Sequence, residues 1–170
     1  LDKNTIVVYT SDQGFYLGEH GWYDKRFIYD ESFKTPLMIR WPNKIKPGIS
    51  SEEMVQNLDF AQTFLEAAMI SAPSDMQGES LIPLMTGENS KWTRESVYYH
   101  YYEYPSVHMV KRHYGIVNKE YKLAHFYYDV DEWELYDRIN DPNEMNNVYN
   151  DPNYANVVKK LTQELKELRI

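Results

Sequence analysis

The chain has 170 residues, of which 42% are hydrophobic and 26% are charged, a composition typical of a folded globular protein. A formal net charge of -8, without an arginine-rich run, argues against a nucleic-acid partner. No apolar run approaches the roughly 20 residues that cross a bilayer, so no membrane span is expected. Cysteine is absent, which excludes disulfides.

The first predicted element is a strand from Thr5 to Ser11, with continuous apolar residues rather than alternating ones. That pattern is typical of a strand buried on both faces in the middle of a parallel sheet. Only four residues precede it, so its neighbouring strands would have to come from outside this sequence. We therefore expect the chain to be part of a longer protein.

Three further elements are predicted before residue 90. Residues 36–41 form a short strand that ends at Pro42. Residues 58–69 form a helix that Asn57 or Asp59 could cap. Its predicted apolar stripe consists of Phe60, Phe64, Leu65 and Ala68. Residues 78–87 form a compact apolar connector.

The character of the chain changes near residue 91, where tyrosine becomes frequent. Strand-like segments at 97–104, 113–117, 121–128 and 133–136 predict an antiparallel meander. A last helix is predicted over 152–168, with an apolar face of Val157, Leu161, Leu165 and Leu168. The sequence thus predicts an α/β portion over 1–90 and an antiparallel sheet with a terminal helix over 91–170.

Chemistry-bearing residues gather where the first strand ends. Asp12 and Gln13 would lie at the carboxyl end of that strand, where open α/β sheets bind ligands. A carboxylate and an amide oxygen suit Ca2+ or Mg2+, although a simple Asx turn with Gly14 is the alternative. A glycine-rich loop leads from there to Lys25, which could bind an anion or could be a solvated loop lysine.

Several stretches resemble type I sulfatases of the alkaline phosphatase superfamily. Ser11-Asp12-Gln13-Gly14 is followed by Leu17-Gly18-Glu19-His20-Gly21, by Lys25, and by Tyr29-Asp30 leading to Pro36-Leu37. Asn57 to Met69 and Gly78 to Gly87 resemble two internal family segments, in the first of which Asp59 looks structural. Trp133 to Asp137 with Asn140 to Asn147 resembles the C-terminal signature. The order and spacing carry the resemblance more than any single stretch.

The resemblance implies a role for each matching position. Asp12 and Gln13 would be metal ligands, and Lys25 would bind the sulfate. The metal would be Ca2+ or Mg2+. Further candidates for substrate contact are His20, His108, Arg112 and His113, each with an ordinary structural role as the alternative.

The implied fold is the C-terminal piece of an alkaline-phosphatase-like mixed sheet sandwich, with a small antiparallel sheet subdomain and a terminal helix. Asp24-Lys25-Arg26 and His100 to Pro105 resemble N-acetylglucosamine-6-sulfatases and related glycan sulfatases. The implied substrate is therefore a sulfated carbohydrate. No Asn-X-Ser/Thr sequon occurs, which favours a bacterial source, and the family resemblance then implies a periplasmic or secreted enzyme.

The nucleophile that the resemblance implies is missing. Type I sulfatases use a formylglycine made from the first residue of Cys/Ser-X-Pro-X-Arg, whereas Ser71-Ala72-Pro73-Ser74-Asp75 ends in aspartate. We therefore expect the formylglycine to lie upstream, in an N-terminal half of the same enzyme, and the chain alone to be inactive.

Two other functions remain open at this point. One is a phosphodiesterase or phosphonate monoester hydrolase of the same superfamily, which would prefer phosphate esters. The other is a non-catalytic glycan-binding module, which would bind oligosaccharide in the presence of a chelator.

Overall fold

The computed structural model describes residues 2–169, which form two compact units. The first unit contains residues 2–12 and 36–94, and the second contains residues 13–35 and 95–169. Residues 13–35 thus group with the C-terminal part of the chain. This differs from the expected division near residue 90, because the side chains of this segment pack on the C-terminal sheet.

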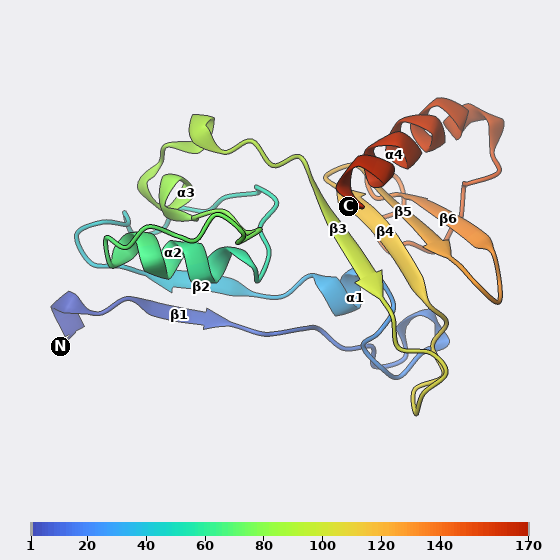
Figure 1. Ribbon diagram of the computed structural model, residues 1–170, viewed down its shortest axis with the longest axis horizontal. Helices are drawn as coiled ribbons and strands as arrows, with labels where there is room; N and C mark the ends of the chain where they lie inside the picture. The colour runs from blue at the N-terminus through green and yellow to red at the C-terminus, as the bar shows by residue number, and fades with distance from the viewer. Residues whose placement is uncertain (1, 170) are drawn as a thin grey trace. The chain divides into compact units, whose positions relative to one another are not determined.

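The first unit contains a two-stranded antiparallel sheet. Strand β1 (Val7–Thr10) pairs with β2 (Leu37–Arg40), and Val8 lies opposite Ile39 (Figure 1). The expected burial of the first strand on both faces is not found, since Val7 is 48% and Tyr9 is 61% exposed. The reason is that β1 has a single neighbouring strand among the described residues, and that strand is antiparallel.

Helix α2 (Asp59–Ala67) buries a polar face, contrary to the expected apolar stripe. Its buried residues are Asp59, Gln62 and Thr63, whereas Phe64 is 48% exposed. The Thr63 hydroxyl accepts a hydrogen bond from the Leu81 amide at 2.8 Å. Polar contacts therefore hold the buried face of the helix, while Phe60 of the predicted stripe packs on the apolar core. The N-cap is Leu58, without a side-chain cap, so neither predicted capping residue occupies that position.

The apolar core of the first unit surrounds helix α3 (Ile82–Thr86). Leu81, Leu84, Met85 and Trp92 are buried there, and Ile39 and Phe60 pack against them. Two short 3-10 turns, Asp2–Asn4 and Asn89–Lys91, lie outside these elements.

The second unit contains the predicted antiparallel meander. Strands β3 (Ser96–Tyr101), β4 (His113–Asn118), β5 (Tyr121–Phe126) and β6 (Glu132–Asp137) are neighbours in chain order. Helix α4 (Ala155–Leu168), preceded by a 3-10 turn at Pro152–Tyr154, lies across one face of this sheet (Figure 1). Leu161 and Leu165 from the helix join a core with Ile116, Leu123 and Leu135. The meander and the terminal helix confirm the prediction, although Leu168, expected on the apolar face of the helix, is 41% exposed.

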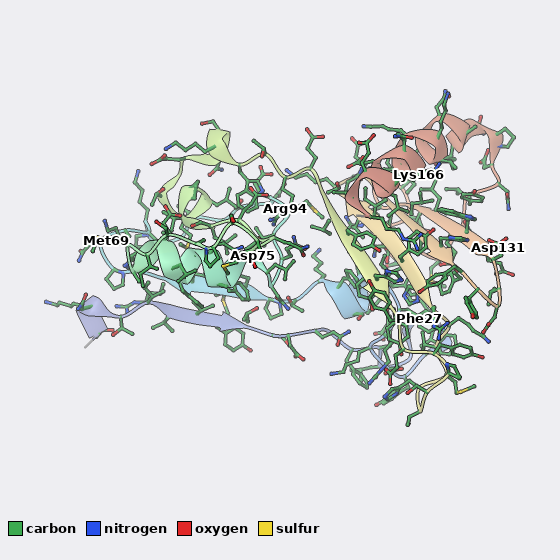
Figure 2. The ribbon with its side chains drawn as sticks, in the orientation of Figure 1. Phe27, Met69, Asp75, Arg94, Asp131 and Lys166 are labelled. Atoms are coloured by element: carbon green, nitrogen blue, oxygen red, sulfur yellow. The ribbon has the colours of Figure 1, made fainter. Side chains whose placement is uncertain are left out.

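Residues 13–35 pack against the face of the four-stranded sheet that points away from α4. Since successive strand residues point to opposite faces, Tyr114 and Leu123 face α4, while His113 and Lys122 point the other way. Phe27 stacks on His113 with ring centroids 5.8 Å apart, and Figure 2 shows Phe27 among the aromatic side chains there. Ile28 is 0% exposed, and a Cβ on Gly115 would lie 2.6 Å from its Cδ1 atom. The segment also contains helix α1 (Asp30–Phe33) and the turn Glu19–Gly21.

Candidate functional site

Most of the predicted site residues lie in the loop formed by residues 13–35. The Gly14 amide donates to the Ser32 carbonyl at 2.8 Å, and the Tyr16 amide donates to the Asp24 carbonyl at 2.7 Å. Gly18 has a φ of 130° and Gly21 a φ of 74°, which are conformations that favour glycine. The Tyr16 ring is 0% exposed, and its hydroxyl donates to the Phe27 carbonyl at 3.0 Å. The loop is therefore closed on itself by main-chain bonds and a buried ring.

Lys25 is held by its main chain. Its carbonyl oxygen accepts a hydrogen bond from the Ser32 hydroxyl at 2.6 Å and a second one from the side-chain amide of Gln13. The same Gln13 nitrogen lies 3.2 Å from the Ser32 hydroxyl. Two predicted site residues thus share one hydrogen-bond network. Because the Gln13 amide donates through its nitrogen, its oxygen is the atom that could coordinate a cation.

Asp12 is the last residue of the first unit before the chain enters the second. Its carboxylate is exposed and lies 3.5 Å from the Ser11 hydroxyl, and its carbonyl accepts a hydrogen bond from the Asn57 side chain at 3.0 Å. Carboxylate and amide oxygens are the donor types that Ca2+ and Mg2+ prefer, so Asp12 and Gln13 fit such an ion by chemistry. Residues 2–169 hold no group of three or more histidine, cysteine or acidic side chains that could bind a metal. Because Ca2+ takes about 6–8 oxygen ligands, other groups would have to complete the site.

His20 lies against its own segment. Its Nε2 atom is 3.3 Å from a Glu31 carboxylate oxygen, and its ring stacks on Tyr29 with centroids 4.3 Å apart. The side chain is 9% exposed. These contacts hold His20 against its own loop, and its contact with a substrate stays a prediction.

Two further candidates are also engaged by the protein. The Arg112 guanidinium donates to the Tyr102 carbonyl at 3.1 Å and to the Tyr104 carbonyl, and so holds the chain after β3. His113 is 0% exposed, and its Nδ1 atom is 2.9 Å from the Lys111 carbonyl. Burial lowers the pKa of His113 to about 4. In this structure His113 has no surface at which a sugar could contact it.

The side chains that flank Lys25 in the sequence are only partly exposed, at 18% for Asp24 and 21% for Arg26. The Arg26 guanidinium lies 2.8 Å from the His108 Nε2 atom and is paired with the Asp24 carboxylate. The His108 side chain is exposed. These three side chains offer donors and acceptors to a polyhydroxylated ligand. Arg26 and His108 are 82 positions apart in the sequence, and the segment that follows β3 brings His108 next to Arg26.

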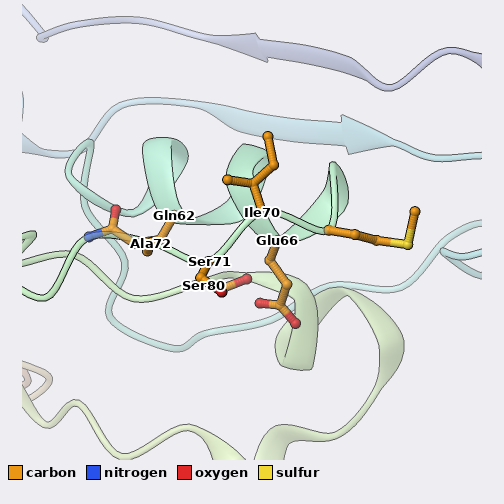
Figure 3. Close-up of a pocket in the computed structure, with 7 residues that line it drawn as sticks. Gln62, Glu66, Ile70, Ser71, Ala72 and Ser80 are labelled. Atoms are coloured by element: carbon orange, nitrogen blue, oxygen red, sulfur yellow. The ribbon is translucent and has the colours of Figure 1, made fainter.

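An open pocket on helix α2 of the first unit is a poor site for an anion. It is lined by Gln62, Glu66, Ser71 and Ser80 together with apolar residues (Figure 3). The Glu66 carboxylate would repel a sulfate group there, and none of the predicted site residues lines this pocket.

The comparison with known protein families decides the class of this chain. The model of the N-sulphoglucosamine sulphohydrolase C-terminal region matches residues 18–170, which is most of the chain. The chain is a sulfatase C-terminal domain.

Individual sulfatases are similar along nearly the whole chain. An N-acetylglucosamine-6-O-sulfatase of Bacteroides thetaiotaomicron is 55% identical over 167 residues, covering 96% of this chain and 30% of that protein. A solved structure of an enzyme in complex with its substrate D-glucosamine-2-N,6-O-disulfate has a TM-score of 0.93 and 55% identity, covering 97% of this chain and 34% of that one. The chain therefore spans about a third of the length of these relatives.

The fold extends beyond sulfatases. A phosphonate monoester hydrolase of Agrobacterium radiobacter matches with a TM-score of 0.84 at 24% identity, covering 96% of this chain and 34% of that one. At that identity the match shows the shared fold alone. The sulfatase domain is thus an α/β piece of alkaline-phosphatase-like architecture with an antiparallel C-terminal sheet.

Some residues of this sulfatase domain were not identified from the sequence. Ser32, Glu31, Lys122 and Glu144 were not predicted to act near the site, yet Ser32 bonds Lys25 and Glu31 pairs with His20. Three of these positions, Glu31, Ser32 and Glu144, fall within family segments, but their contacts depend on the folding of the chain. Within residues 2–169, no helix has the length and apolar character needed to cross a membrane.

Proposed function

We propose that this chain is the part of a glycan sulfatase that supplies the metal-binding Asp12 and Gln13 and the sulfate-binding Lys25. The proposed substrate is a sulfated carbohydrate such as N-acetylglucosamine-6-sulfate. The observation that carries the proposal is the hydrogen-bond network in which the Gln13 side chain and the Ser32 hydroxyl both hold the Lys25 carbonyl. The network joins Gln13, the proposed metal ligand, to Lys25, the proposed sulfate-binding residue, within one folded loop.

The chemistry of sulfate-ester cleavage explains why a lysine suits this position. Negative charge accumulates on the oxygens as the S–O bond to the sugar breaks. An ammonium on a flexible stem can follow this charge without requiring a bidentate geometry. The Ser32 and Gln13 bonds fix the main chain of Lys25, so that the side chain starts from a defined point.

Two groups expected from outside this chain complete the proposal. A Ca2+ or Mg2+ ion held in part by Asp12 and Gln13 would polarise the sulfate oxygens. A formylglycine in the N-terminal half of the enzyme would supply the nucleophile that attacks sulfur. This sequence has no cysteine and no Ser-X-Pro-X-Arg segment, so we propose that the 170 residues alone do not turn over.

Sugar recognition is proposed for the exposed His108 and the partly exposed Arg26 and Asp24. The Arg26 guanidinium and the His108 ring lie 2.8 Å apart, and Asp24 pairs with the same guanidinium. Fixed donors and acceptors of this kind favour a ligand with several hydroxyl groups over a simple aryl ester. The similarity to an N-acetylglucosamine-6-O-sulfatase supports this substrate class.

The test uses the complete native enzyme purified from its source. We expect it to release sulfate from N-acetylglucosamine-6-sulfate, and Lys25→Met to lower kcat/KM by about 10²–10³-fold. Lys160→Met removes an exposed lysine of α4 and serves as the matched control. Preference for a phosphate diester or phosphonate would instead support the superfamily alternative and contradict the proposal.

The metal is tested by a readout other than turnover. Chelation should lower the Tm of the complete enzyme, and Ca2+ or Mg2+ should restore it, because an ion bound only by the native state stabilises that state. Asp12→Asn should reduce the Tm shift that the ion produces. Oligosaccharide binding that persists unchanged with chelator, in a protein without turnover, would favour a glycan-binding module.

A further inference from the structure

Four charged side chains form a cluster of ion pairs at the start of helix α1 in the second unit. The Lys122 ammonium on β5 lies 2.7 Å from an Asp30 carboxylate oxygen and 2.5 Å from a Glu144 carboxylate oxygen. The Arg138 guanidinium lies 2.7 Å from the other Asp30 oxygen. Two carboxylates and two cations thus balance in charge. They join residues separated by up to 114 positions in the chain.

The centre of this cluster is removed from water. The Lys122 side chain is 0% exposed and the Glu144 side chain is 1% exposed. Burial alone would raise the pKa of Asp30, but Lys122 and Arg138 hold it below its usual value, whereas burial raises the pKa of Glu144 despite Lys122. Removing one member of such a cluster leaves an uncompensated buried charge. The geometry therefore depends on every member being present.

The cluster fixes the start of helix α1. Asp30 is the first residue of this helix, and its amide donates to the second Glu144 carboxylate oxygen at 2.9 Å. Glu144 therefore holds Asp30 by its main chain, while Lys122 and Arg138 hold its side chain. The helix has four residues, which is too short to be stable by itself. Its position is thus set by side chains of the C-terminal sheet and the turn after it.

The same helix holds the proposed sulfate-binding lysine. Ser32 lies two residues after Asp30, is 1% exposed, and donates its hydroxyl to the Lys25 carbonyl at 2.6 Å. The path from Lys122 to Lys25 therefore runs through the ion pair with Asp30, along the main chain of α1 to Ser32, and through the hydrogen bond of Ser32 to the Lys25 carbonyl. We propose that Lys122 and Glu144, on the C-terminal sheet and its following turn, are positioning residues that hold Lys25 in its working place. This proposal rests on the proposed function of Lys25.

A double-mutant cycle in the complete native enzyme tests the proposal. Because a displacement of about 1 Å can cost about 10²-fold in rate, we expect Lys122→Met to lower kcat/KM for N-acetylglucosamine-6-sulfate by about 10–100-fold. In a Lys25→Met background the same substitution should change kcat/KM less than about 3-fold, because the group that it positions is already gone. Glu144→Gln should show the same dependence on Lys25.

Leu161→Ala is the control for loss of stability alone. Leu161 is 1% exposed in the core beneath α4, so its truncation destabilises the same unit without touching the contacts of Lys25. Any effect of Leu161→Ala on kcat/KM should be equal in both backgrounds. If Lys122→Met fails to fold, the double substitution Lys122→Met/Glu144→Gln takes its place in the cycle. The double substitution removes one charge of each sign, so no single buried charge is left unpaired.

The outcomes separate this proposal from the proposed function. A large loss for Lys25→Met, with an effect of Lys122→Met that is absent or equal in both backgrounds, would overturn the positioning role and leave the function of Lys25 in place. An unchanged kcat/KM for Lys25→Met would overturn both. A loss for Lys122→Met that disappears in the Lys25→Met background supports both.

Discussion

The Ser32 hydroxyl donates a hydrogen bond to the Lys25 carbonyl at 2.6 Å, across seven positions of the chain. The bond is enclosed, since Ser32 is 1% exposed. Gln13 donates to the same carbonyl from the start of the loop. The two ends of the loop therefore converge on the main chain of the residue whose side chain is proposed to bind sulfate.

The first prediction concerns this bond. Ser32→Ala removes the hydroxyl and leaves the Lys25 carbonyl with one fewer donor in a site closed to water, so we expect a loss of about 1–3 kcal/mol in the free energy of unfolding. Urea unfolding measures it. Ser51→Ala, which removes an exposed hydroxyl that accepts from the Glu53 amide, should have an effect below about 0.5 kcal/mol. Equal effects of the two substitutions would contradict the enclosed bond.

The second prediction concerns Gly14. A Cβ at this position would lie 1.9 Å from the Glu31 carbonyl oxygen, which is a main-chain atom and cannot rotate away. We expect Gly14→Ala to displace α1 from the loop and to lower the free energy of unfolding by about 1–3 kcal/mol or more. Gly48→Ala is the comparison for backbone strain without a clash, because nothing lies within 4 Å of its Cβ position but its φ of 76° disfavours alanine, at a cost of about 1–2 kcal/mol. A wild-type Tm for Gly14→Ala would show that the close approach does not exist.

The third prediction concerns the ion pair that orients helix α2. The Arg94 guanidinium binds Asp59 through two bonds of 2.5 and 2.7 Å, and the Asp59 side chain is 0% exposed. Arg94→Met would leave that carboxylate buried and unpaired, which costs about 3–5 kcal/mol. The control is Arg40→Met, because the pair of Arg40 with Asp2 is exposed and should contribute at most about 1 kcal/mol. Chemical denaturation of both variants measures whether loss of the buried pair lowers the free energy of unfolding more than loss of the exposed pair.

The fourth prediction is a pH dependence from His113. Its pKa is lowered to about 4 by burial, so between about pH 6.5 and 4 the unfolded chain binds a proton that the folded chain does not. Stability should therefore fall as the pH decreases through this window, by about 3 kcal/mol in total, and no further below it. His113→Phe, which keeps a ring among the surrounding aromatic side chains, should flatten that slope. A variant with the wild-type pH profile of unfolding would assign the slope to another group.

The fifth prediction concerns the proposed N-terminal half of the enzyme. Tyr9 and Met38 are each 61% exposed on the two strands of the first unit, although both are large apolar side chains. We expect the rest of the polypeptide to cover them. Hydroxyl-radical footprinting should modify both side chains in the isolated 170 residues and spare them in the complete protein. Tyr128, which is 81% exposed in the second unit, provides the internal reference. Equal modification of Tyr9 in both samples would place the contact elsewhere.

Local patterns in the sequence were enough for most elements. The meander from Ser96 to Asp137 was predicted from short segments rich in tyrosine, because aromatic residues favour strands. The helix that ends at Leu168 was predicted from the spacing of its apolar residues. The motif around Asp12 and Lys25 indicated a sulfatase, and the family match confirmed that class. The individual roles of Asp12, Gln13 and Lys25 stay predictions.

The tertiary structure decided what periodicity could not. The apolar stripe of α2 predicted that Phe64 would be buried, but Asp59 is buried instead because Arg94, 35 positions away, pairs with it. In the same way, no local pattern indicates that Lys122 meets Asp30 across 92 positions. The sequence by itself determined the family, the meander and helices α2 and α4, because these depend on neighbouring residues, whereas the short helices α1 and α3 were not predicted. The partners of the buried charges, and hence the support of Lys25, depend on distant segments that only the folded chain brings together.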